Sequence, residues 1–115
     1  MASARTVGEL IRERFGLHVA PRVNRSLTSV GTTAARLWPN DPDRLAALLV
    51  NLSVNQLWGG WWPDVSSTKG IRVGPSGGSW ELVWYDDFDL VMYEAFVIAD
   101  VAASTLLTVE WVATG

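Results

Sequence analysis

The feature that most constrains the fold of this chain is a succession of short apolar segments, each bounded by polar turn signals. The clearest example covers residues 38–62. It contains a turn rich in Pro, Asn and Asp, then an apolar run, a second polar turn and a cluster of tryptophans. This succession predicts strand, turn, buried strand, turn and aromatic strand.

The apolar run at residues 44–52 is ambiguous by composition alone. Asp43 is suited to cap a helix, and the Leu and Ala residues that follow are good helix formers. A short apolar run between two turns is equally typical of a fully buried strand. The turns on both sides and the strand-like segments downstream favour the strand.

The same reasoning predicts about seven strands in the whole chain, at residues 32–38, 44–52, 56–62, 70–73, 79–85, 93–101 and 106–112. The fifth of these alternates most clearly, so Trp80, Leu82 and Trp84 are expected on one face. Residues 86–89 are expected to form an acidic turn. Strands spaced about 8 to 12 residues apart with polar turns are typical of an antiparallel β-sandwich or barrel.

A short helix is predicted before these strands, over about residues 7–15. Residues 6–9 fit a capping box, and Gly16 is suited to end the helix. Its apolar face would carry Val7, Leu10, Ile11 and Phe15. So short a helix is rarely stable in water without packing, so this face must dock on its own domain or on a partner subunit. Leu10, Ile11 and Phe15 are therefore candidate interface residues.

Residues 17–28 are predicted to be an extended arm or an edge strand, since Pro21 disfavours helix there. His18, the only histidine, is interpreted as a structural residue because no nucleophile or ligand motif accompanies it. The predicted organisation is an anchoring or assembly segment at residues 1–33 and a β domain at residues 34–115.

Composition narrows the possible chemistry. The chain has 115 residues, which suits one domain, and it has no cysteine, which removes disulfides, thiolate metal sites and cysteine nucleophiles. No apolar run reaches about 18 residues, so no membrane partner is expected. An acidic calcium site at Asp86, Asp87 and Asp89 with Glu81 or Glu94 is less expected than a solvated turn. No catalytic, cofactor-binding or metal-binding residues are predicted.

The charge is unevenly placed along the chain. Seven basic and four acidic residues lie in residues 1–44, whereas two basic and eight acidic residues follow. Either the surface charge is sorted by chance, or the basic segment lies on an acidic partner, which could be a neighbouring copy. Nucleic acid is not an expected partner, because the basic residues are scattered and an acidic domain repels phosphate.

Trp58, Trp61 and Trp62 are the other candidate interface residues. Strand alternation sends Trp58 and Trp62 to one face and Trp61 to the other, if the glycines between them leave the register intact. A subunit interface is the favoured interpretation. The alternatives are a place in the core and an aromatic platform that stacks on sugar rings.

The ordered turns from Trp38 to the C-terminus carry a resemblance. The matching residues are Asn40, Pro42, Arg44, residues 48–51, Ser53, Ser66, Ser67, residues 70–73, residues 77–79 and Glu81. In this order they resemble small tailed-bacteriophage virion proteins, among them head-decoration, head-fibre, tail and adaptor proteins. The resemblance implies a virion location and a structural role without enzyme activity. It also implies a homo-oligomer that binds the major capsid protein or other virion proteins.

Overall fold

The computed structural model describes residues 18–24 and 27–114, which form nine strands and two short helical turns. In chain order these are β1 (His18–Val23), β2 (Ser29–Val30), β3 (Ala35–Trp38), β4 (Arg44–Asn51), β5 (Leu57–Gly60), β6 (Ile71–Val73), β7 (Ser79–Val83), α2 (Trp84–Asp87), the 3₁₀ helix η1 (Phe88–Met92), β8 (Ala95–Ala99) and β9 (Ser104–Thr114).

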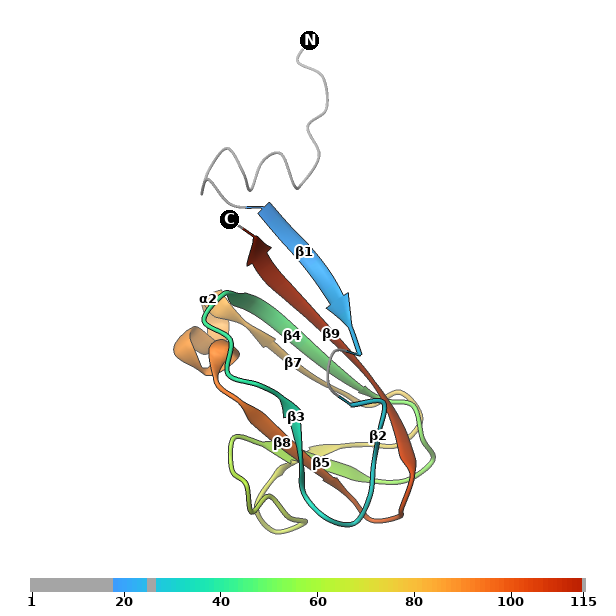
Figure 1. Ribbon diagram of the computed structural model, residues 1–115. Helices are drawn as coiled ribbons and strands as arrows, with labels where there is room; N and C mark the ends of the chain where they lie inside the picture. The colour runs from blue at the N-terminus through green and yellow to red at the C-terminus, as the bar shows by residue number, and fades with distance from the viewer. Residues whose placement is uncertain (1–17, 25–26, 115) are drawn as a thin grey trace.

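Strand β9 is the centre of the first sheet. On one side it pairs antiparallel with β4, which in turn pairs with β7. On the other side β1 pairs with the C-terminal part of β9, and β2 pairs with its first two residues. The strand order is therefore β1-β9-β4-β7. Strand β2 pairs with the start of β9, on the same side as β1. Figure 1 shows β1 and the end of β9 extending together past β4 and β7.

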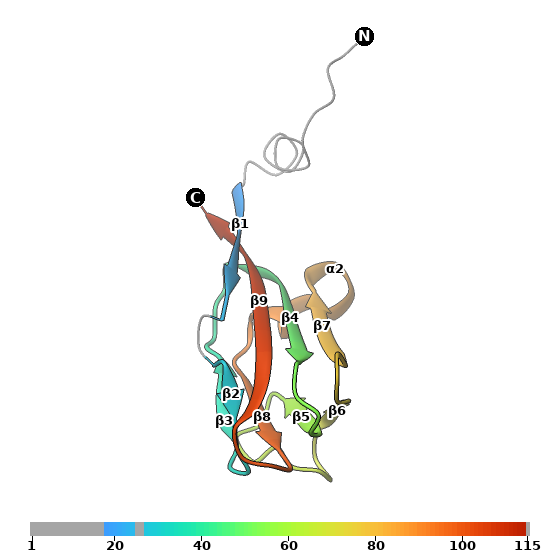
Figure 2. The same cartoon turned by 90° about the vertical axis from the view of Figure 1, so that its right-hand side faces the viewer.

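The second sheet has the order β3-β8-β5-β6, and all of its pairings are antiparallel. It lies beside the end of β9 that pairs with β2, while β1 lies toward the opposite end (Figures 1 and 2). Because the two sheets enclose one shared core, the architecture is β-sandwich-like.

Alternate residues of the two sheets build that core. Leu49 of β4 and Leu57 of β5 are fully buried, and Trp80 of β7 is 7% exposed. Burying a large apolar side chain contributes about 1.5–3 kcal/mol, so these positions supply much of the stability. The apolar run at residues 44–52 is a strand, as predicted, because it lies between β9 and β7 and pairs with both.

The predicted mainly β, antiparallel class is confirmed, as two sheets. The described residues contain nine strands, not about seven, because β1 and β2 form where an arm or edge strand was expected. Both strands pair with β9. They lie within residues 1–33, the predicted anchoring segment, and the boundary between that segment and the β domain stays a prediction. The predicted helix at residues 7–15, with Leu10, Ile11 and Phe15, lies outside the described residues.

The predicted strand at residues 79–85 ends early, at Val83. The backbone N–H of Val83 donates a 2.8 Å hydrogen bond to Oδ2 of Asp87, and the chain turns into α2 and η1. Trp84 therefore leaves the face that carries Trp80 and Leu82 and is 48% exposed. The expectation that these three side chains share one face was wrong for Trp84.

Within the described part of the chain, no helix is both long enough and apolar enough to cross a membrane.

Candidate functional site

Strand β9 directs a mixed set of polar and apolar residues into the molecule and a mainly apolar set outward. Thr108 and Glu110 are buried, at 2% and 1% exposure. Leu107, Val109 and Trp111 point away from the second sheet and keep part of their surface exposed. A solvated face of an antiparallel sheet is normally polar. The outward side of β9 is therefore unusually apolar for such a face.

The apolar character continues across the neighbouring strands, because the register aligns the outward side chains in rows. The first row holds Pro21, Trp111, Ala46 and Val83, the second holds Val23, Val109, Leu48 and Glu81, and the third holds Leu107, Val50 and Ser79. The pair Val19 and Ala113 lies beyond the first row. We call this surface the outer face. Glu81 is the only charged side chain among the described residues that form it.

The size of the outer face supports a role in binding. The three rows, two across four strands and one across three, cover on the order of 400 Å², from ordinary strand spacings. Continuous apolar patches larger than a few hundred Å² on soluble proteins commonly mark interaction sites. Trp111 lies in the first row between Pro21 and Ala46, and tryptophan is enriched in the buried centres of interfaces.

On the inner side of the first sheet, the buried guanidinium of Arg44 connects several elements of the fold. Its Nη1 lies 2.6 Å from Oε1 of Glu110, in an ion pair whose side chains are 0% and 1% exposed. The same guanidinium donates to three backbone carbonyls, those of Val91 at 2.7 Å, Pro39 at 3.0 Å and Tyr93 at 3.0 Å. It also lies 5.5 Å from the ring centroid of Trp38. Arg44 therefore ties β9, η1 and the turn before β4 together.

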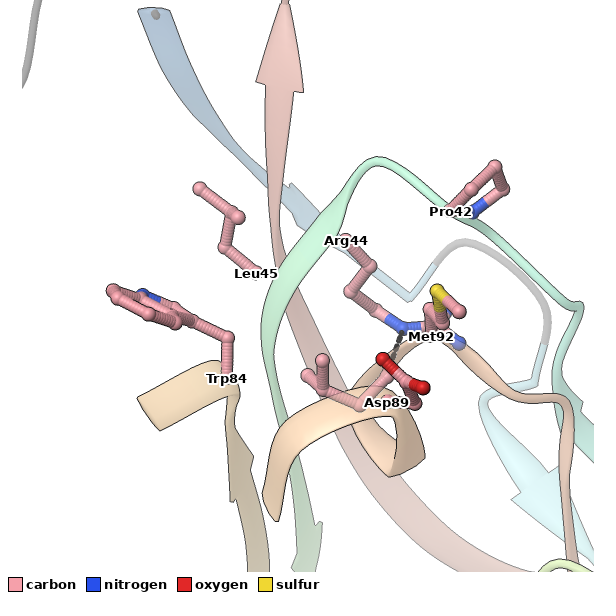
Figure 3. A pocket seen from close by; sticks show the side chains of 7 residues that line it. Pro42, Arg44, Leu45, Trp84, Asp89 and Met92 are labelled. Carbon is pink, nitrogen blue, oxygen red and sulfur yellow. Dashed lines mark hydrogen bonds between the residues drawn. The ribbon is translucent and has the colours of Figure 1, made fainter. Parts of the chain in front are cut away.

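A cavity of about 290 Å³ lies beside Arg44, and its lining is completed by Pro42, Leu45, Trp84, Asp89, Val91 and Met92. Figure 3 shows Arg44 pointing toward η1, with the dashed bond to Val91, while Leu45 and Trp84 lie on the other side of β4. The Arg44 guanidinium bonds to backbone carbonyls. The exposed lining groups that a ligand could contact are therefore the Trp84 ring and the Asp89 carboxylate. A cavity lined by both an aromatic ring and a carboxylate suits a small polar ligand with an apolar side.

Four tryptophans form a continuous series from the core to the surface. The Trp38 and Trp80 rings are stacked at 5.9 Å, and Trp61 meets Trp80 edge-on at 5.2 Å. Trp62 meets Trp61 edge-on at 6.1 Å and is 39% exposed. The Lys69 ammonium lies 5.7 Å from the Trp62 ring centroid. Trp61 also donates a 3.1 Å hydrogen bond to the Leu90 carbonyl. This bond connects the tryptophan series to η1.

The three predicted tryptophans do not share one surface. Trp58 is partly exposed on the outward side of the second sheet, between Ile98 and Arg72. Trp61 is partly buried against the core, whereas Trp62 is exposed. The predicted alternation does not extend to Trp61 and Trp62, because β5 ends at Gly60. Their interface role stays a prediction, and Trp62 is the most exposed of the three.

The glycines of β5 make room for two of these rings. A Cβ at Gly59 would lie 2.8 Å from two atoms of the Trp80 ring. A Cβ at Gly60 would lie 2.5 Å from the Trp62 ring. Glycine within a strand often marks such a close approach.

Two of the acidic residues have defined partners. Asp87 accepts the hydrogen bond from Val83, and Asp64 lies 2.9 Å from Lys69 at the surface. The hydrogen bond from Lys69 lowers the pKa of Asp64 below its usual range. Within residues 18–24 and 27–114, no group of three or more His, Cys, Asp or Glu side chains is arranged to hold a metal ion.

Asn51 and Ser53 fix a turn. Asn51 is fully buried, and its side-chain amide donates to the carbonyls of Asn55 at 2.7 Å and Val73 at 3.1 Å. Its Oδ1 accepts from the backbone N–H and the hydroxyl of Ser53, at 2.9 and 2.7 Å. The Asn-x-Ser motif therefore encodes the connection from β4 to β5, which is a framework role and not a binding role.

The outer face was not among the predicted sites, although the sequence contains a signal for it. In residues 104–114, one alternating set is Ser, Leu, Thr, Glu and Val, and the other includes Leu107, Val109, Trp111 and Ala113. The second set is the more apolar, so it would be assigned to the core by pattern alone. Only the sheet topology shows that the first, mixed set faces the core and that the more apolar second set faces outward.

Comparison of this chain with protein-family models, with curated proteins and with solved structures finds no match.

Proposed function

We propose that this chain is a structural protein of a tailed-phage virion, a capsid decoration or accessory protein without enzyme activity. The observation that carries the proposal is the outer face, where the apolar residues of β9, β4 and β1 point away from the core. A protein of this kind works by covering such a surface with a partner. The proposed partners are the major capsid protein or other virion proteins, with further copies of this chain in the assembly.

The chemistry of the described interior supports a structural role. Its buried charged groups, Arg44 and Glu110, pair with each other, and Arg44 also bonds to backbone carbonyls. Buried Asn51 bonds to the backbone of its own turn at Asn55 and to the backbone of β6 at Val73. Groups used in this way hold loops in place. The positions that the chain shares with the phage proteins it resembles include Arg44 and Asn51, so the resemblance rests on this framework.

The test is sedimentation velocity of the purified chain mixed with undecorated capsid shells or with isolated tails. Saturable co-sedimentation with shells is the expected result, and the saturation ratio gives the number of copies per lattice site. Binding to tails alone would replace the decoration role with a tail or adaptor role. A chain that sediments alone in both mixtures would contradict the proposal.

Two matched variants connect the binding to the outer face. Val109→Lys places a charge in its second row, whereas Ile98→Lys places the same charge on the outward side of the second sheet. Both residues are partly exposed, so the two changes cost the fold similar amounts. Val109→Lys is expected to weaken binding to shells at least tenfold, and Ile98→Lys is expected to leave it within about twofold. Equal losses in the two variants would move the binding surface elsewhere.

A second candidate function is carbohydrate or host-receptor binding, and the cavity beside Trp84 favours it. Trp84 is 48% exposed and lines this cavity together with Asp89. A glycan array with the wild-type chain, Trp84→Ala and Trp61→Ala separates the possible locations. Binding lost only in Trp84→Ala would support the cavity, and loss only in Trp61→Ala would support the tryptophan series. No binding by the wild-type chain would exclude the glycans on the array.

A further inference from the structure

We propose that copies of this chain associate head to tail, with Val54 of one copy seated in the cavity beside Trp84 of the next. The inference rests on the function proposed above for the presence of several copies in one assembly, and it names the two surfaces by which those copies meet. One surface is a group of exposed apolar side chains, and the other is the mainly apolar cavity at the start of β4.

The projecting surface consists of three turns at one end of the sandwich. They cover residues 52–56, 74–78 and 100–103, and we call them the tip. The exposed large apolar side chains of the tip are Leu52 at 57%, Val54 at 82% and Val101 at 47%. Val54 is the most exposed large apolar residue in the part of the chain that the structure describes. A single exposed apolar residue is ordinary, but three on adjoining turns form a group that a partner can cover.

Hydrogen bonds between the turns hold the tip in one shape. The backbone N–H of Ser76 donates to the carbonyl of Ser53 at 2.8 Å, which joins the second turn to the first. The backbone N–H of Gln56 donates to Oδ1 of Asp100 at 2.9 Å, which joins the third turn to the first. Asp100 is the only charged residue within these described turns. Because the tip is already ordered, it loses little conformational entropy when it docks.

The cavity lies at the opposite end of the same strands. Strand β4 begins beside the cavity at Arg44 and ends at Asn51, where the tip begins. Strand β7 runs the other way, from Ser79 at the tip to Val83, the residue before Trp84. Figure 1 shows α2 at one end of β4 and the turn that follows β4 at the other end. An eight-residue strand is about 23 Å long, so the tip cannot enter the cavity of its own chain.

The size and lining of the cavity fit apolar side chains. Its volume of about 290 Å³ is at the lower limit for small-molecule sites, which are about 300–1,000 Å³. Apart from Arg44 and Asp89, the lining residues are apolar. The Arg44 guanidinium is bound to Glu110 and to backbone carbonyls, and Asp89 is exposed, so its carboxylate can stay in contact with water. The remaining surface suits the uncharged apolar side chains of the tip.

Two different surfaces at opposite ends of a chain give a heterologous contact. Such a contact repeats from copy to copy and produces a ring if the rotation closes, or a filament if it does not. The outer face covers the side of the first sheet between these two ends. Each copy in such a series therefore still presents its outer face to a virion partner.

Sedimentation velocity of full-length chains tests the contact, in a concentration series up to about 1 mM, where even weak association is populated. Val54→Asp places a charge on the tip, and Leu45→Arg places a long charged side chain in the cavity lining. Ile71→Asp is the matched control for Val54→Asp, because Ile71 is also exposed and apolar but lies on β6. The wild type and Ile71→Asp are expected to associate within about twofold of each other, and the two test variants at least tenfold more weakly.

A mixture of the two test variants examines the head-to-tail arrangement. Val54→Asp keeps an intact cavity and Leu45→Arg keeps an intact tip, so the mixture can form one contact between unlike chains. Heterodimers and no larger species are expected, whereas each variant alone stays monomeric. If urea unfolding shows that Leu45→Arg does not fold, Trp84→Ala replaces it, because it removes another part of the cavity lining.

Three results would overturn the contact. They are a wild-type chain that stays monomeric throughout the series, equal association of Val54→Asp and Ile71→Asp, and a mixture of the two test variants that does not associate. The proposed function is judged separately. A wild-type chain that self-associates through the tip but binds neither shells nor tails would refute the proposed function and leave the contact standing. A chain that binds shells but is monomeric alone would do the reverse.

Discussion

Replacement of Arg44 tests whether the buried ion pair is the main tie between β4, η1 and β9. Arg44→Met removes the 2.6 Å contact to Glu110 and the hydrogen bonds to the carbonyls of Val91, Pro39 and Tyr93. Removing one partner of a buried ion pair typically costs about 3–5 kcal/mol. Glu110→Gln keeps the shape of the side chain and leaves the three carbonyl contacts in place, so it is expected to cost less, about 2–3 kcal/mol.

The assay is equilibrium unfolding in urea, followed by tryptophan fluorescence, because Trp38 lies 5.5 Å from the guanidinium. Thermal unfolding gives the same comparison. At about 4 °C per kcal/mol for a domain of this size, Arg44→Met should lower Tm by roughly 12–20 °C. The double variant should be at least about 1 kcal/mol more stable than the sum of the two single losses predicts, because the residues contact each other. A loss below about 1 kcal/mol for Arg44→Met, or additive losses, would refute this reasoning.

Two further predictions concern Gly59, which contacts the tryptophan series, and the Asp64–Lys69 pair beside Trp62. Gly59→Ala should destabilise the fold by about 1–3 kcal/mol, because its Cβ would lie 2.8 Å from the Trp80 ring, whereas Gly74→Ala, with nothing within 4 Å, should change urea stability little. An unchanged Gly59→Ala midpoint would contradict the packing. In an NMR titration the pKa of Asp64 should lie below its usual range and should rise in Lys69→Gln. Any stabilisation from this pair is present above the unfolded-state pKa and is lost as the pH falls through the folded-state value; identical titrations would argue against the contact.

Local patterns in the sequence were sufficient to find most of the strands. The turns on either side of residues 44–51 identified β4, although its Leu and Ala residues also favour helix. The short run between Gly70 and Gly74 identified β6, and the alternation of residues 79–85 identified β7. These signals are local, since turn chemistry and alternation need no knowledge of partners.

The parts that failed depend on particular side-chain contacts, one local and one distant in the sequence. The end of β7 is set by Asp87, which binds the Val83 backbone and starts a helical turn where alternation alone continues to Trp84. The inward position of Glu110 depends on Arg44, which is 66 residues away. Without that pair, a reader of the sequence would place Trp111 inside and Glu110 outside. The outer face therefore could not be found before the topology was known.

The most direct measurement of the outer face as the assembly surface is site-specific photo-cross-linking in the assembled complex. Benzoyl-phenylalanine at Leu48 lies in the second row of the outer face, whereas the same residue at Ile98 lies on the outward side of the second sheet. After irradiation of the complex with shells, Leu48→benzoyl-phenylalanine should form a covalent adduct with a virion protein and the Ile98 variant should not. Adducts from Ile98 alone, or from neither position in a complex that still forms, would contradict assembly through the outer face.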